Sequence, residues 1–259
     1  CEQIEIDWQY DSAVQAADNE LFVRTFVREI FRLYGLEVNF KAKPLIGLAG
    51  NGEHTHLSLA AITKDGKRHS LFAADDQNAY YMNAVGYGAL MGLLKNYEAI
   101  NPFVSATNDA FNRLKPGFEA PVCVVTSFGE SPAIPSRNRT VLVSLIRDLK
   151  NPLATRFELR ATNPYSNTYL VIAASYLAIL DGIKYSAGHT ADELLAELSK
   201  QPGESAGYLE KDRAYRSEED VFEHYTADER DARFGKPPAT VWENMLGFDL
   251  YPEKVAVLT

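Results

Sequence analysis

Two stretches of the chain alternate apolar and polar residues with the period of a β-strand. Residues 4–10 place Ile, Ile, Trp and Tyr on one side and polar residues, Glu5 among them, on the other. Residues 53–59 place His54, His56 and Ser58 on one face, and Thr55, Leu57 and Leu59 face the other way. Each pattern predicts a half-buried strand, and the second strand follows a flexible Gly50-Asn51-Gly52 loop.

The same periodicities predict the other elements. Further strands are expected over 36–46, 122–126, 141–146 and 156–160. Helices are expected from a Ser12–Gln15 capping box to Gly35, from Asp75 or Asp76 through Leu94, from Tyr169 to near Gly188, over Ala191–Ser199, and around Glu218–Tyr225 and Thr240–Leu246. In the strand at 156–160, Arg156, Glu158 and Arg160 share one face.

Composition narrows the class of protein. With 259 residues, 46% hydrophobic and 24% charged, the chain is long enough for a large core. A net charge of −9 argues against a nucleic-acid partner. The longest apolar run, Tyr169 to Leu180, is too short to span a bilayer, so no membrane partner is expected. Two cysteines cannot build a disulfide framework, which favours a reducing, cytoplasmic compartment.

The chain starts at Cys1, without Met, inside a strand-like pattern, so we expect a piece of a longer protein. No internal repeat or convincing linker divides it. The simplest organisation is one domain, with a core over residues 1–187 and a helical extension of the same domain over 188–259.

The polar faces combine two kinds of chemistry. Glu5, His54 and Glu158 are carboxylates and an imidazole, a donor set that suits Mg²⁺ or Mn²⁺. Four arginines offer planar cations for phosphate or carboxylate: Arg113, Arg139, Arg156 and Arg160. A divalent metal beside several arginines is what phosphoryl transfer requires. No GxxxxGK[ST] sequence is present, so a P-loop does not cradle the phosphates.

The ordered blocks resemble the C-terminal catalytic part of the glutamine synthetase family. They are Glu5-Ile6-Asp7 with Ala16-Ala17-Asp18, Lys43-Pro44 with residues 50–59, residues 112–121, Arg137-Asn138-Arg139, Arg156-Phe157-Glu158-Leu159-Arg160, and residues 166–170 with 180–183. Together they span about residues 1–187. The resemblance implies an α+β fold in which a curved, mainly antiparallel β-sheet, or half-barrel, packs against long helices.

The resemblance also implies residue roles. It makes Glu5 a ligand of the metal that holds the amino-acid substrate, and His54 and Glu158 ligands of a second metal that bridges ATP phosphates. Nucleotide contacts fall on His56, Ser58, Arg139 and Arg156, and substrate contacts fall on Gly50, Arg113 and Arg160. Arg139 and Arg160 also act in phosphate transfer, and Glu119 is a flap residue that helps to deprotonate ammonium.

The implied reaction is a two-step ligation. ATP phosphorylates the γ-carboxylate of glutamate, and ammonia then displaces phosphate to give glutamine. The implied cofactor is Mg²⁺ or Mn²⁺, the small-molecule partners are ATP, glutamate and ammonia, and the full-length protein is expected to be a homo-oligomer. Further metal-binding glutamates of the family would precede Cys1, so the fragment alone is expected to be inactive.

Three departures keep other functions open. Ala49, Glu53 and Ser144 replace residues that are common in the family near the substrates. They motivate a ligase of the same fold that joins glutamate to another amine, or a different acid to ammonia. A hydrolase with a His-x-His metal pair and a non-catalytic, nucleotide-binding homologue are the other candidates.

Overall fold

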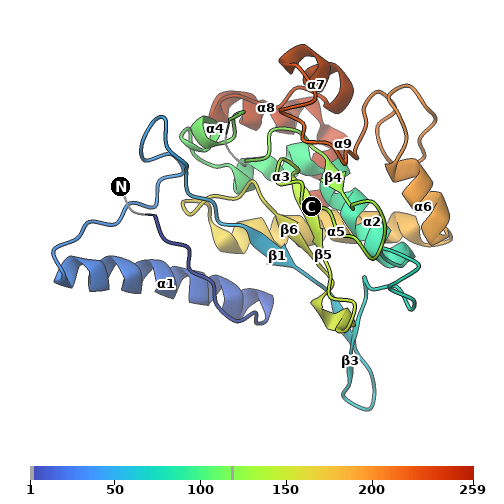
Figure 1. The fold of residues 1–259 in the computed structure, drawn as a ribbon, viewed down its shortest axis with the longest axis horizontal. Helices are drawn as coiled ribbons and strands as arrows, with labels where there is room; N and C mark the ends of the chain where they lie inside the picture. Colours follow the sequence, from blue (N-terminus) through green and yellow to red (C-terminus); the bar gives the residue numbers. More distant parts are fainter. Residues whose placement is uncertain (1–2, 118–119) are drawn as a thin grey trace.

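The computed structural model describes residues 3–117 and 120–259, in which strands and helices come in successive groups along the chain (Figure 1). The helices are α1 (Ala13–Leu33), α2 (Ala84–Lys95), α3 (Tyr97–Val104), α4 (Ala110–Arg113), α5 (Thr168–Ser186), α6 (Ala191–Leu198), α7 (Ala227–Phe234), α8 (Val241–Leu250) and α9 (Pro252–Val255), with short 3₁₀ helices η1 (Pro152–Ala154) and η2 (Ala256–Leu258). The strands are β1 (Thr55–Leu57), β2 (Ala60–Ile62), β3 (Arg68–Ser70), β4 (Thr126–Ser127), β5 (Val143–Ile146) and β6 (Arg156–Leu159).

One curved sheet joins segments that are far apart in the sequence. Its strand order is β1-β6-β5-β4, and β2 and β3 form a separate hairpin. The pairs β1–β6, β5–β6 and β2–β3 are antiparallel, whereas β4 and β5 are parallel. The α+β fold with a mainly antiparallel curved sheet against helices is therefore confirmed.

Two long helices, α2 and α5, pack closely in the core because glycines remove side chains from their contact. A Cβ on Gly182 of α5 would lie 2.0 Å from the carbonyl oxygen of Gly88 in α2, and one on Gly92 would lie 2.1 Å from the carbonyl of Ala178. The glycines that lower helix propensity are thus required by packing. No helix within the described ranges combines the length and apolarity that a membrane crossing needs.

Two predicted strands are wrong, and a third, over 122–126, forms only at Thr126, where β4 begins. Residues 3–12 are exposed and extended but form no ladder, and Gln3 instead donates to the Gly50 carbonyl at 2.9 Å. Residues 36–46 are irregular, and a side chain, not a neighbouring strand, forms hydrogen bonds with their backbone carbonyls. The side chain of Asn51 donates to the carbonyls of Asn39 and Lys41 at 3.1 and 2.8 Å. Alternation alone predicts a face, but a strand also needs a neighbour to pair with.

Several helix limits differ from the sequence pattern. Gly35 does end α1, with a φ of +72°, as the pattern predicts. Ser12 makes no side-chain cap, so the predicted capping box there is wrong. Helix α2 begins after Asn83, whose side chain accepts from the Gly86 amide, and not at Asp75 or Asp76. The helix predicted around 218–225 is absent, and those described residues form turns and bends.

The segments after α5 pack back onto the core helices. Helix α6 contacts α2, while α8 and α9 contact α3. Lys254 of α9 is 2% exposed and its ammonium lies 2.8 Å from Glu98 of α3, which also pairs with Arg213 at 2.5 Å. Buried cations and a buried carboxylate neutralise one another there. A division of the domain at residue 187 stays a prediction.

Two carboxylates, Glu20 of α1 and Glu53 just before β1, meet at the hydroxyl of Thr168 at the start of α5. The hydroxyl of Thr168 lies 3.1 Å from Glu20 and 3.0 Å from Glu53, but its single hydrogen can be donated to only one carboxylate. Burial first, and then the charge of Glu20, raises the pKa of Glu53 to about 8. A proton on Glu53 supplies the donor that the second contact needs, so Glu53 is neutral at pH 7.

We predict that Gly182→Ala destabilises the fold by about 1–3 kcal/mol, because its Cβ would overlap the Gly88 carbonyl and force α2 and α5 apart. Urea unfolding measures the loss. Ala173→Ser on the exposed side of α5 is the matched control and should shift stability by less than about 0.5 kcal/mol. Equal stabilities for the two variants would contradict the packing.

We predict that stability falls as pH rises from about 4.5 to about 8, because Glu53 keeps its proton in the folded state and loses it in the unfolded chain. Glu53→Gln cannot titrate, so part of this fall should disappear. The measurement is the urea midpoint at pH 5 and pH 8, with exposed Glu37→Gln as control. A variant whose midpoint falls as much as that of the wild type would refute the raised pKa.

Candidate active site

The antiparallel pairing of β1 with β6 brings the two predicted polar faces together. The two strands lie side by side (Figure 1), and His56 lies directly opposite Glu158 in the register. His54 Nδ1 lies 3.0 Å from Glu158 Oε1, although the two residues are more than a hundred positions apart. The exposed His54, His56 and Ser58 and the buried Leu57 confirm the alternation predicted for this strand.

Two buried arginines flank this His–Glu pair. Arg160 Nη1 donates to Glu158 Oε1 at 2.8 Å, and Arg160 is 4% exposed. Arg113 is equally buried, and its Nη2 lies 3.5 Å from His54 Nε2. Arg113 also donates to the carbonyls of Arg160 and Ala161 at 2.8 and 3.0 Å, so backbone atoms fix its guanidinium beside the histidine.

These contacts set the charges of the site. Burial alone would raise the pKa of Glu158, but the hydrogen bond with His54 and the charge of Arg160 lower it to about 2. Glu158 is therefore ionised at neutral pH. Burial, followed by the charge of Arg156, lowers the pKa of His56, and its Nδ1 accepts from Arg156 Nε at 2.8 Å. Its Nε2 then carries the hydrogen and is the ring donor of a neutral imidazole.

The glycine loop lies against Arg113. A Cβ on Gly50 would be 2.2 Å from the carbonyl oxygen of Ala42 and 3.1 Å from Arg113 Cγ. A Cβ on Gly52 would be 2.7 Å from Arg113 Nη2 and 2.9 Å from His54 Nε2. Both positions therefore need glycine so that the backbone can approach the histidine and the arginine.

Ser58, on the same face as His54 and His56, also lines a cleft. This cleft of about 1010 Å³ lies between residues 8–13, α1 and the β1–β2 segment, and Tyr176 of α5 lines it as well. Tyr176 donates from its hydroxyl to the Ser58 carbonyl at 3.0 Å. The cleft carries Arg68 and several aromatic rings.

The backbone of Arg139 is hydrogen-bonded to Arg160, which in turn contacts Glu158 of the His54–Glu158 pair. The Arg139 carbonyl accepts from Arg160 Nε at 3.3 Å, and the Arg139 side chain is exposed. Ser144 pairs in register with Glu158. Arg147 donates to backbone carbonyls, including that of Pro132 at 2.7 Å.

One predicted site residue that the structure describes, Glu5, does not join this cluster. Glu5 is exposed in the segment 3–12, and the part of the chain that the structure describes contains no group of three His, Cys, Asp or Glu side chains placed to hold a metal ion. The structure therefore does not bring Glu5 to His54 and Glu158. Glu119 lies outside the described residues.

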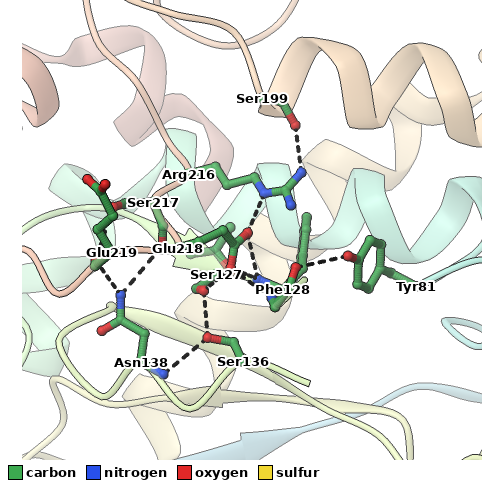
Figure 2. Close-up of polar contacts among 12 residues, drawn as sticks. Tyr81, Ser127, Phe128, Ser136, Asn138, Ser199, Arg216, Ser217, Glu218 and Glu219 are labelled. Carbon is green, nitrogen blue, oxygen red and sulfur yellow. Dashed lines mark hydrogen bonds and ion pairs between the residues drawn. The ribbon is translucent and has the colours of Figure 1, made fainter. Parts of the chain in front are cut away.

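One cluster of hydrogen-bonded side chains beside the site is not predicted by the sequence. Glu218, Ser127, Ser136 and Asn138 form a hydrogen-bond network around the loop that leads to Arg139 (Figure 2). Glu218 stands in the acidic run 218–220, a pattern that is typical of a solvated surface. No spacing rule in the sequence connects it to β4.

The arrangement suits binding of an anion next to a divalent cation. His54 and Glu158 offer one nitrogen and carboxylate oxygens at one point, and Mg²⁺ commonly takes one or two protein ligands and completes its shell with water and phosphate. The hydrogen bond from Arg160 fixes the orientation of the Glu158 carboxylate that would bind the metal. Arg113, Arg156 and Arg160 add fixed positive charge around that point, so the residues present fit a metal–phosphate site.

Known proteins match both the sequence and the fold. A family model described as "Glutamine synthetase, catalytic domain" matches residues 1–226. Glutamine synthetase of Methylococcus capsulatus is 36% identical over 202 residues, which cover 78% of this chain and 39% of that relative. Glutamine synthetase of Pseudomonas aeruginosa is 33% identical over 233 residues, or 85% of this chain and 46% of that relative.

The solved structure of a GmaS/ADP complex matches 97% of this chain and 49% of its own, with a TM-score of 0.68 and 24% identity. An apo GmaS structure matches with a TM-score of 0.66 and 23% identity. These likenesses show the fold. The chain spans less than half the length of the relatives it matches. Residues 1–226 carry the catalytic-domain match, and the chain therefore belongs to the glutamine synthetase family.

Proposed function

We propose that the protein containing this chain is an ATP-dependent ligase that joins ammonia to glutamate through a γ-glutamyl phosphate and so forms glutamine. The observation that supports this most is the contact between His54 Nδ1 and Glu158 Oε1 at 3.0 Å beside two buried arginines. Family membership supports the same class of reaction. Because the chain spans only part of its relatives, the proposal concerns the whole protein.

In this proposal the chain's own residues bind and orient. His54 and Glu158 would hold one Mg²⁺ or Mn²⁺, which supplies charge neutralisation at the ATP phosphates when bound. Arg160 holds the substrate carboxylate and the transferring phosphate, and Arg113 shares the carboxylate. The buried Arg160 and Arg113 are already fixed by Glu158 and by backbone carbonyls, so little ordering is needed when substrate arrives.

The nucleotide would lie along the exposed face of β1 and β6. His56, Ser58, Arg139 and Arg156 are the proposed contacts. Arg156 already orients the His56 ring through a 2.8 Å hydrogen bond, which leaves Nε2–H of the ring as a donor toward the ligand. Glu5 and Glu119 keep their proposed roles in the ammonium site and the flap.

One observation favours a second candidate. Ser144 lies opposite Glu158 at a position where family members commonly have arginine, so this site has one cation fewer at that point. A related ligase that joins glutamate to another amine fits this change. Phosphate release by the full-length protein, with ATP, glutamate and either ammonia or methylamine, separates the two. We expect faster phosphate release with ammonia. Faster phosphate release with methylamine would select the second candidate. Binding of ADP without turnover would refute both candidates.

We predict that His54→Ala in the full-length protein weakens Mn²⁺-dependent ADP binding at least about tenfold, because it removes a metal ligand. His56→Ala should weaken the binding of ADP with less effect on Mn²⁺ affinity. Calorimetric titration measures both ligands, and His69→Ala, an exposed histidine of β3, is the control. Equal loss of Mn²⁺ affinity in the first two variants would contradict the ligand assignment.

We predict that Arg160→Ala raises the KM for glutamate by roughly 10- to 100-fold, since a charge-assisted hydrogen bond contributes about 1.5–3 kcal/mol. The KM for ATP should change much less. Steady-state kinetics with either substrate varied decide this, and a melting curve checks that the variant folds. A KM that rises for ATP and not for glutamate would show that Arg160 has another role.

A further inference from the structure

The loop between β4 and β5 has a defined conformation, held by a close backbone contact and an internal hydrogen bond. Gly129 has a φ of +96°, and a Cβ there would lie 2.2 Å from the carbonyl oxygen of Ile134. The amide of Ser136 donates to the Phe128 carbonyl at 3.1 Å, so the loop folds back on itself. Residues 129–140 line a cleft of about 550 Å³ together with Glu218 and Asp220.

Glu218 holds the first end of this loop. Its Oε2 accepts from the amides of Gly129 at 2.7 Å and Phe128 at 3.0 Å, and from the Ser127 hydroxyl (Figure 2). Its Oε1 accepts from Arg216 Nε at 2.6 Å. Burial raises the pKa of Glu218, but these donors outweigh it and the net shift is downward, which keeps the carboxylate ionised at neutral pH.

Asn138 holds the other end of the loop to the same C-terminal segment. Its Nδ2 donates to the Glu219 carbonyl at 2.7 Å, and its Oδ1 accepts from the amide of Thr140 at 2.9 Å. The hydroxyls of Ser127 and Ser136 lie 2.6 Å apart and join the two ends (Figure 2). The loop is therefore clamped at both ends by residues 216–219.

The clamped loop places Arg139 beside the candidate site. Arg139 stands between Asn138, which the clamp holds, and Thr140, which is 3% exposed. Its carbonyl accepts from Arg160 Nε, and Arg160 in turn donates to Glu158 at 2.8 Å. Hydrogen bonds on either side of the peptide bond between Asn138 and Arg139 therefore connect residues 216–219 to the His–Glu pair.

We propose that Glu218 is a positioning residue, which together with Asn138 fixes loop 128–139 so that Arg139 stays aligned with Arg160 beside the phosphate site. Glu218 touches no reacting atom. The kinetic half of this inference rests on the proposed function, because it takes Arg139 as a phosphate-binding group. The clamp itself is a property of the fold and can be measured separately.

The chemistry of the clamp indicates which substitution breaks it. Two backbone amides and one hydroxyl donate to the same carboxylate oxygen, Oε2 of Glu218. In Glu218→Gln the negative charge is lost, and the amide NH₂ faces a donor in either orientation: Arg216 Nε on one side, or the amides of Phe128 and Gly129 on the other. The volume of the side chain is almost unchanged, so packing is preserved while the hydrogen bonds on one side of the clamp are lost.

The first arm of the test is hydrogen exchange on the full-length protein. Glu218→Gln should accelerate exchange of amides in residues 128–139 by at least about tenfold, since the loop opens locally more often. Glu223→Gln, an exposed glutamate of the same segment, should leave exchange unchanged. Unchanged exchange in Glu218→Gln would overturn the clamp. If that variant does not fold, Asn138→Ala breaks the other end and carries the same expectation.

The second arm is a double-mutant cycle in phosphate release. We expect Glu218→Gln to lower kcat at least about tenfold with little change in the KM for glutamate. Arg139→Ala combined with Glu218→Gln should lose no more than Arg139→Ala alone, because Glu218 acts through Arg139. Fully additive losses would overturn the positioning role. A wild-type protein without ligase turnover would contradict the proposed function, while the exchange arm would still decide the clamp.

Discussion

The pairing of β1 with β6 is the constraint on which the candidate site depends. With His56 opposite Glu158, the period of two along each strand sends His54, His56, Glu158 and Arg160 to one face of the sheet. A slip by one residue would turn every one of these side chains to the opposite face. Leu57, Phe157 and Leu159 are buried behind them, so the hydrophobic core fixes the register that the chemistry needs.

The C-terminal segment contributes to the same geometry from the far edge of the sheet. Residue 216 bridges to Thr126 of β4, and Glu218 and Asn138 hold the loop that carries Arg139. Helix α9 is tied to α3 through the Lys254–Glu98 ion pair, and α8 packs against α3 as well. The residues after α5 are therefore more than a surface addition, because their contacts extend to the arginines beside the pair.

The sequence predicts the elements that carry their own pattern. The polar face of 53–59, the strand at 156–160 and the end of α1 at Gly35 follow from alternation and from turn chemistry. It fails at 4–10 and 36–46, where alternation is present but no pairing strand lies alongside in the described structure. It also misses Glu218, because that carboxylate gains its role only from backbone amides about ninety residues away.

The most direct test is the position of Mn²⁺ in the full-length protein with ADP bound, found by anomalous scattering. The His54–Glu158 pair predicts a peak within roughly 2.1 Å of a Glu158 oxygen and of a His54 ring nitrogen, with β1 and β6 in the register described. Manganese that touches neither residue, or strands whose pairing separates them, would contradict the site.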